Sequence, residues 1–144
     1  MGAQAFRRPE SVLVIVHTPA RECLLLRRVR PPDFWQSVTG TLDWGERAEH
    51  AAAREVREET GLDPQGLVDA HVARRFPILP AWRRRYAPDV EENLEHLWYL
   101  EIPTAAPVTL DPEEHSAYEW LPLEAAIARV ASWTNREALE RLRV

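Results

Sequence analysis

The sequence predicts an α/β fold in a single domain spanning residues 1–144. Short apolar runs bounded by turn residues predict strands in both halves of the chain. Between them, residues 46–60 combine regularly spaced alanines with charged side chains, which indicates an amphipathic helix. A chain of 144 residues can bury a core without disulfide or metal support.

The first half of the chain predicts three strands before the helix. SVLVIVH (11–17) and ECLLLRRV (22–29) are apolar and flank the turn-like TPAR, so we expect a hairpin of two buried strands. WQSVTGTL (35–42) predicts the third strand. Gly40 and Gly45 then bracket a short loop that leads into the helix.

The second half predicts two long strands, a short strand and two helices. The helix of residues 46–60 should end at Gly61, with Pro64 beyond it. Thr134 and Glu137 have capping-box spacing for the last helix, and Pro122 suits a first helical turn. The remaining expected segments are strand 66–76, loop 78–90, strand 92–102, loop 104–117, and a strand and helix within 118–130.

Composition excludes several classes of protein. The net charge of -5 argues against general nucleic-acid binding. Cys23 is the only cysteine and residues 1–10 lack the apolar run of a secretory signal, so we expect a cytoplasmic protein. The longest wholly apolar run, 12–16, is far too short for a membrane span. The five histidines lack metal-ligand spacing, so a zinc site is not expected.

The end of the predicted helix, REVREETG (54–61), carries an unfavourable concentration of acid. Carboxylates repel one another at this spacing and oppose the negative end of the helix dipole. At about 100° per residue, Glu55 and Glu59 fall on the alanine side of the helix, and Glu58 lies at its edge near Arg54.

Two interpretations of these carboxylates follow. A charge run of this kind usually marks a solvated helix face with arginine–glutamate pairs. If instead the carboxylates face a cleft with the alanines, a bound divalent cation would offset their repulsion and burial. Hard cations such as magnesium bind one or two carboxylates together with substrate phosphates.

Residues 40–62, GTLDWGERAEHAAAREVREETGL, resemble the signature segment of the Nudix hydrolases. That pattern is Gly, five residues, Glu, seven residues, Arg-Glu, an aliphatic residue, any residue, Glu-Glu, any residue, Gly and an aliphatic residue. Every defined position is filled, by Gly40, Glu46, Arg54, Glu55, Val56, Glu58, Glu59, Gly61 and Leu62.

The resemblance implies an α/β/α sandwich with a mixed sheet and a loop–helix–loop catalytic motif. It implies hydrolysis of a diphosphate linkage with magnesium, or alternatively manganese. Glu55 and Glu59 would bind the metal, and Glu58 would be a further ligand or the base. Gly40, Glu46 and Arg54 would shape the loop and orient these groups. The expected partner is a small-molecule polyphosphate, with no membrane, nucleic acid or obligate protein partner.

Stretches outside this segment resemble one Nudix subgroup, the dihydroneopterin triphosphate pyrophosphatases of folate synthesis. The matching stretches are FRRP (6–9), PDFWQSVTG (32–40), RRYAP (84–88), EHSAYEWL (114–121) and SWTNR (132–136). The resemblance implies that Glu114 is a remote metal ligand. It also implies substrate contacts by Arg7, Arg28, Thr39, Phe76, Pro77, Ile78, Leu79 and Ser132.

Aromatic and basic side chains extend this candidate site. Phe34, Trp35, Trp82, Tyr86 and Trp133 could each stack on a flat pterin or purine ring, although core packing is the commoner role of such residues. Trp35 is favoured by its place in the matched stretch. Arg85 is the best candidate of its arginine run to bind the triphosphate.

Three functions stay open on this basis. The first is magnesium-dependent hydrolysis of dihydroneopterin triphosphate to dihydroneopterin monophosphate and pyrophosphate. The second is Nudix hydrolysis of dinucleoside polyphosphates or modified nucleoside triphosphates, because the signature segment fixes the chemistry and not the base. The third is a catalytically silent domain that senses a ligand.

Overall fold

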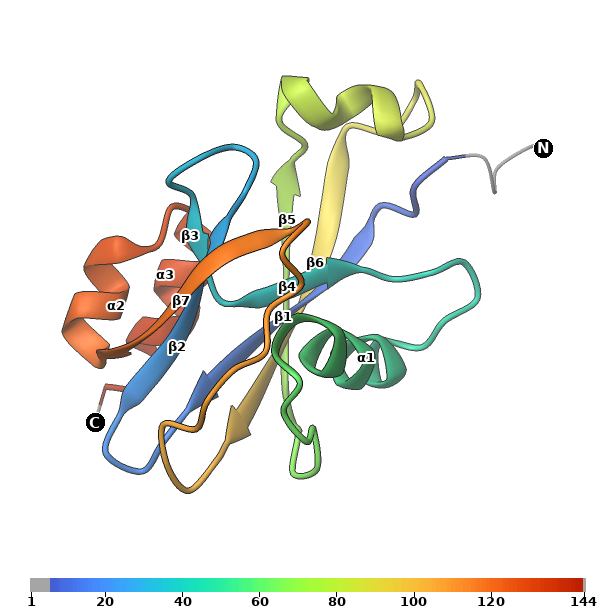
Figure 1. The fold of residues 1–144 in the computed structure, drawn as a ribbon. Helices are drawn as coiled ribbons and strands as arrows, with labels where there is room; N and C mark the ends of the chain where they lie inside the picture. Colours follow the sequence, from blue (N-terminus) through green and yellow to red (C-terminus); the bar gives the residue numbers. More distant parts are fainter. Residues whose placement is uncertain (1–5, 144) are drawn as a thin grey trace.

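The computed structural model describes residues 6–143 and shows one mixed sheet with helices on both faces (Figure 1). The strand order is β3-β2-β1-β6-β5, with β4 paired to β1 and β7 paired to β2. The strands are β1 (Glu10–His17), β2 (Glu22–Arg28), β3 (Trp35–Gln36), β4 (Val38–Thr41), β5 (Val68–Pro77), β6 (Glu92–Glu101) and β7 (His115–Pro122). This arrangement confirms the expected α/β sandwich.

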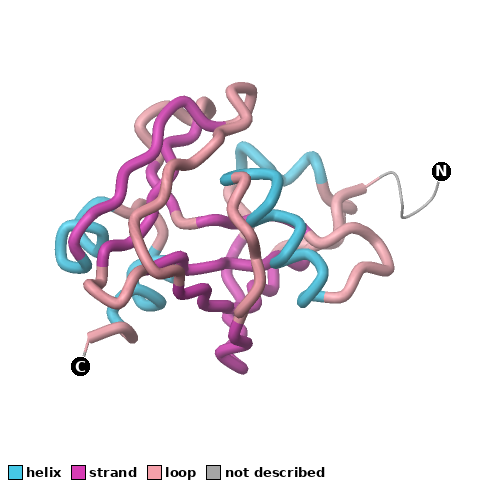
Figure 2. The backbone as a smooth tube through the Cα atoms, turned by 60° about the horizontal axis from the view of Figure 1, so that its bottom comes forward, coloured by secondary structure: helices cyan, strands magenta, loops and turns pink. Residues whose placement is uncertain are grey.

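The helices lie on opposite sides of the sheet (Figures 1 and 2). α1 (Ala48–Thr60) packs on β1 and β4, whereas α2 (Leu123–Arg129) and α3 (Trp133–Glu140) pack together near β1 and β2. A short 3-10 helix, η2 (Pro80–Arg85), lies beyond the end of β5. No helix among residues 6–143 is long and apolar enough to span a membrane.

The alternation of β1 divides the core in two. Val12, Val14 and Val16 face α1 and belong to one apolar cluster, which includes Ala51 and Val56. Leu13 and Ile15 face α2 and α3 and belong to a second cluster. The helix with the acidic end is therefore held against the middle of the sheet by buried apolar area.

The expected hairpin of 11–17 and 22–29 is correct only at its turn. His17 pairs with Cys23, but β1 otherwise pairs with β4 and, in parallel, with β6. The strand expected over 35–42 is also interrupted, at Ser37. The backbone N–H of Ser37 donates to Asn135 Oδ1 at 2.8 Å, so a contact with α3 replaces a sheet hydrogen bond there.

Three local predictions in the second half need correction. The loop expected over 78–90 contains η2, and β7 begins at His115 within the loop expected over 104–117. The last helix begins at Trp133, and its N-cap is Ser132, whose Oγ accepts from the Asn135 backbone N–H at 3.2 Å. Thr134 is instead inside the helix and hydrogen-bonds to Ser132 at 2.8 Å.

Candidate functional site

The inner face of α1 carries two carboxylates among its alanines. Ala51, Ala52 and Val56 are fully buried, and on the same face Glu55 is 8% exposed and Glu59 3% exposed. Arg57 and Glu58 are exposed on the outer side. This burial agrees with the helical-wheel prediction and rules out a fully solvated acidic face.

Gly61 ends α1 directly after the acidic run. It has a left-handed φ of 71°, and its backbone N–H donates to the Arg57 carbonyl at 2.9 Å. A side chain would be strained in this conformation. The glycine therefore fixes Glu58 and Glu59 in the last turn.

Arg54 supplies part of the positive charge that this helix end requires. Its guanidinium donates to both carboxylate oxygens of Glu46 at 2.9 Å and to Glu55 Oε2 at 3.0 Å. It also reaches Glu58 at 3.3 Å. The hydrogen bonds with Glu46 are the largest cause of a raised Arg54 pKa. A fixed guanidinium thus orients two carboxylates from the loop and the helix.

Gly40 leaves the space that Glu55 occupies. A Cβ at Gly40 would lie 2.0 Å from Glu55 Oε2, a distance at which one of them must move. Next to it, the Thr39 hydroxyl donates to the Val12 carbonyl at 2.8 Å. The strand β4 therefore meets α1 closely, and it does so at the carboxylate.

Glu59 has the donor chemistry of a metal ligand. Burial raises its pKa well above the ordinary value, and the neighbouring Glu55 charge raises it further. One carboxylate oxygen, Oε1, is buried with no hydrogen-bond partner. A buried acceptor without a donor is costly, and a hard cation would satisfy it.

The remaining predicted ligand, Glu114, lies in the exposed loop before β7. It lines the same cleft as Glu55 and Glu59, and its charge contributes to the raised Glu59 pKa. Glu58 and Glu55 are held by Arg54, and within residues 6–143 no three acidic, His or Cys side chains converge closely enough to form a metal cluster. The carboxylates fit a cation that also takes ligands from a substrate and from water.

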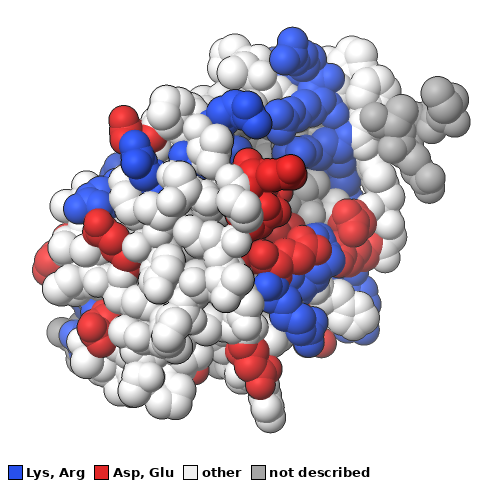
Figure 3. All heavy atoms as spheres, in the orientation of Figure 1, with Lys and Arg blue, Asp and Glu red and all other residues white. Residues whose placement is uncertain are grey.

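A large cleft of about 1450 Å³ connects these carboxylates to η2 and to the start of α3. Figure 3 shows acidic side chains gathered beside a band of basic ones on one face of the molecule. Among the predicted substrate residues, those that line the cleft are Arg7, Arg28, Thr39, Phe76, Pro77, Ile78, Leu79, Arg85 and Ser132.

Arg28 joins the acidic and aromatic parts of the cleft. Its guanidinium lies 5.5 Å from the centre of the Trp82 ring, and Trp82 meets Phe34 edge to face at 6.5 Å. Burial lowers the Arg28 pKa, whereas the charges of Glu59 and Glu114 raise it. A basic group therefore faces the carboxylates across the cleft.

Trp35 does not lie where a substrate contact was expected. It is absent from the cleft lining, packs against the core cluster on the α2–α3 side and lies 5.1 Å from the Arg129 guanidinium. Neighbouring residues of a strand point to opposite faces, so the Phe34 and Gln36 side chains line the cleft and that of Trp35 does not.

The sequence interpretation missed the polar floor of the cleft beneath α3. Glu95 and Asn93 of β6, Ser11 of β1 and Asn135 of α3 all line it. The signal was present in ENLEHLWYLE, where the buried Asn93, Glu95 and Leu97 alternate with the partly buried Leu94 and His96. A charged residue at an inward position of a strand is a useful indicator of a site.

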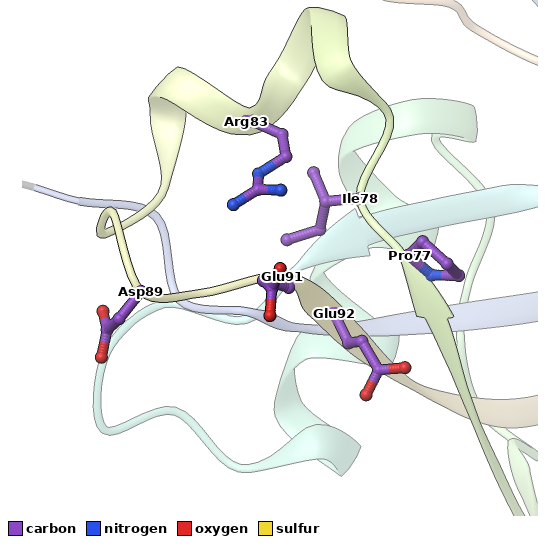
Figure 4. Close-up of a pocket in the computed structure, with 6 residues that line it drawn as sticks. All are labelled: Pro77, Ile78, Arg83, Asp89, Glu91 and Glu92. Atoms are coloured by element: carbon purple, nitrogen blue, oxygen red, sulfur yellow. The ribbon is translucent and has the colours of Figure 1, made fainter.

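A smaller hollow of about 520 Å³ lies where β5 ends and β6 begins (Figure 4). Arg83 extends from η2 toward Ile78 and Glu91, whereas the Asp89 carboxylate points away. The lining is completed by Pro77 and Glu92. It contains none of the α1 carboxylates, so the larger cleft is the candidate site.

Comparison with known proteins identifies the class to which this fold and site belong. The NUDIX domain family matches residues 7–142, so the chain belongs to the Nudix family. It is 40% identical over 146 residues to the dihydroneopterin triphosphate diphosphatase of Escherichia coli (strain K12), covering 98% of this chain and 96% of that protein. The Haemophilus influenzae dihydroneopterin triphosphate diphosphatase is 33% identical over 94% of this chain and 88% of its own length.

A solved structure agrees with these relatives. The E. coli dihydroneopterin triphosphate pyrophosphohydrolase superimposes with a TM-score of 0.89 and 40% identity, over 96% of this chain and 97% of that one. The chain is therefore a Nudix hydrolase whose whole-length relatives are pyrophosphohydrolases. Nudix hydrolases generally use divalent metal ions, which agrees with the donor set on α1.

Proposed function

We propose that this protein hydrolyses dihydroneopterin triphosphate to dihydroneopterin monophosphate and pyrophosphate with magnesium. The observation that carries the proposal is one continuous cleft that places buried carboxylates beside arginines and aromatic side chains. The similarity of the chain to two dihydroneopterin triphosphate diphosphatases, over 98% and 94% of its length, supports the proposal.

The acidic end of the cleft would hold the metal through Glu55 and Glu59, with Glu58 and Glu114 at its edge. Magnesium bound there would neutralise charge on the diphosphate and lower the pKa of an attacking water. Glu58 is the most accessible of the three helix carboxylates, with a side chain 56% exposed. It is therefore placed to accept a proton from water if it turns away from Arg54.

The basic side of the cleft would bind the triphosphate. Arg7, Arg28 and Arg85 line it, and Arg28 faces both Glu59 and Glu114. Arginine binds phosphate oxygens through paired N–H donors. Such contacts would hold the diphosphate linkage next to the carboxylates, and the ring would extend toward Phe34 and Trp133.

The thiol of Cys23 is consistent with a cytoplasmic site of action. The side chain is buried, and burial raises its pKa to about 11, so it has little thiolate character. The chain needs no disulfide to close its core.

The test is a substrate competition with the purified protein and magnesium. Equal concentrations of dihydroneopterin triphosphate, diadenosine tetraphosphate and 8-oxo-dGTP are supplied, and the product of each is quantified. We expect the highest kcat/KM for dihydroneopterin triphosphate, with pyrophosphate released. Preference for either nucleotide would contradict the substrate, and magnesium-dependent binding without turnover would indicate a silent domain.

A further inference from the structure

Glu95 lies in the floor of the cleft, away from the carboxylates of α1. In the sheet it pairs with Ser11 of β1 and Arg74 of β5. Its side chain points to the same face of β6 as Leu97, which belongs to the core cluster under α3. Only 9% of the residue is exposed, yet it lines the cleft.

The polar residues around Glu95 are already paired with one another. Asn93 Nδ2 donates to Ser11 Oγ at 2.8 Å, and Asn135 Nδ2 donates to Ser37 Oγ at 2.9 Å. The two hydroxyls at the start of α3, those of Ser132 and Thr134, bond to each other at 2.8 Å. These pairs leave few donors for a buried carboxyl group.

The nearby charged side chains are paired as well. Arg74, opposite Glu95 on β5, forms an ion pair of 2.7 Å with Glu137 of α3. The hydroxyl of Thr134 is the one side chain that lowers the Glu95 pKa by hydrogen bonding. A carboxylate can accept about four hydrogen bonds, so Glu95 has unused acceptor capacity that faces the cleft.

The walls above this floor are apolar and partly aromatic. Leu13 and Ile78 line the cleft as buried side chains, and Trp133 lines it with 48% of its surface exposed. Large exposed aromatic surface next to a polar floor favours a flat heterocycle whose edge carries hydrogen-bond donors. The floor offers an acceptor pair, so the edge should present two adjacent N–H groups.

We propose that Glu95 determines base specificity by accepting hydrogen bonds from the N–H edge of a 2-amino-4-oxopyrimidine ring. Pterins and guanine share this edge, where the ring N3–H and the exocyclic 2-amino group lie side by side. A carboxylate accepts two such parallel donors with both oxygens. Adenine has no pair of adjacent donors, and hypoxanthine lacks the 2-amino group. The inference rests on the proposed function and assigns the group that would recognise its ring.

The test compares Glu95→Gln with the unmodified protein by measuring how strongly GTP and ITP each inhibit substrate turnover. The quantity compared is the ratio of the ITP to the GTP inhibition constant. These nucleotides differ only in the 2-amino group. Because a hydrogen bond to a charged group is worth about 1.5 to 3 kcal/mol, GTP should compete roughly 10- to 100-fold better than ITP. Glu95→Gln should reduce this ratio to about one, chiefly by weakening GTP. The exposed Glu101, on the same strand, provides Glu101→Gln as a control that should keep the ratio.

A purely structural role for Glu95 would weaken both competitors equally and leave the ratio unchanged, which would overturn the inference. Equal inhibition of the unmodified protein by GTP and ITP, or inhibition by neither, would also overturn the inference. The assay uses whichever substrate is turned over fastest, so it tests Glu95 even if dihydroneopterin triphosphate is not preferred. Thermal denaturation with each nucleotide gives the same comparison without turnover, and equal stabilisation of the unmodified protein by both would also contradict the proposal.

Discussion

Gly40 and Glu55 are in contact at the point where β4 crosses α1. A Cβ on Gly40 would lie 2.0 Å from Glu55 Oε2, and the backbone of Gly40 itself needs no glycine conformation. Space for the carboxylate is therefore the reason for glycine at this position. The atoms that would collide with a Cβ are at the flexible end of Glu55, so the carboxylate can move more easily than the backbone.

Gly40→Ala should accordingly impair metal binding more than folding. We expect the magnesium concentration for half-maximal activity to rise roughly 10- to 100-fold. The free energy of unfolding should fall by at most about 1 to 3 kcal/mol, as for moderate overpacking of a core. Gly45→Ala is the control, because Gly45 has a φ of 80° and open space around it. It should lose about 1 to 2 kcal/mol of stability and keep the magnesium response. The reverse pattern would assign Gly40 a backbone role.

Arg54→Lys tests whether the guanidinium orients the carboxylates or only neutralises them. Lysine retains the charge but cannot bind both oxygens of Glu46 and also reach Glu55, as Arg54 does. We expect kcat to fall roughly 10- to 100-fold at saturating substrate. Arg57→Lys, on the exposed face of the same helix, should leave kcat unchanged. Equal activity of both variants would reduce the role of Arg54 to simple charge.

The acidic helix end could be predicted from sequence because helix geometry is local. The periodicity of Ala51, Ala52 and Val56 fixes one face of α1, and Glu55 and Glu59 must share it. That conclusion depends only on bonded geometry within a short segment. The loop that would orient these carboxylates was implied instead by the resemblance of residues 40–62 to the Nudix segment.

Features set by contacts between distant segments were missed or misplaced. The interruption at Ser37 depends on Asn135, which lies 98 residues further along the chain. The side chain of Trp35 packs against Arg129, a residue 94 positions further along the chain that local periodicity does not place beside it. Glu95 is one polar position of the strand expected over 92–102, and only the packing of α3 shows that its face is covered. Sequence periodicity gives the alternation of a strand and not which face is buried.

Glu58→Gln and Glu59→Gln should separate catalysis from stability. A positioned base contributes about 10² to 10⁴-fold, so at least one variant should lose turnover to that extent while staying folded. Removing the Glu59 charge also removes its repulsion with Glu55 and the cost of a buried carboxylate. Without metal, Glu59→Gln should therefore unfold at a higher temperature than the unmodified protein, and Glu58→Gln, at an exposed position, should not. Full turnover in both variants would refute the assignment of the site.

Glu95→Gln should make stability less sensitive to pH. Burial raises the pKa of Glu95 to about 7 from an ordinary value of 4.5, opposed by a hydrogen bond from Thr134. Between these two values the folded protein holds a proton that the unfolded chain has lost, so stability falls as pH rises from about 4.5 to about 7. Glutamine does not titrate and escapes this loss.

The expected gain follows from the size of the shift. We compare the free energy of unfolding of Glu95→Gln with that of the unmodified protein. As the pH rises from 4 to 8, this difference should shift by roughly 2 to 3 kcal/mol in favour of the variant. Urea denaturation at both pH values measures the difference. Arg74 lies opposite Glu95 on β5 and pairs with Glu137 of α3 in both proteins, so the contribution of this ion pair should cancel. Glu101→Gln should show no such gain. If the difference in free energy of unfolding between Glu95→Gln and the unmodified protein does not change with pH, Glu95 is hydrated and the prediction is wrong. If Glu95→Gln is stabilised at pH 8, its loss of substrate discrimination does not arise from unfolding.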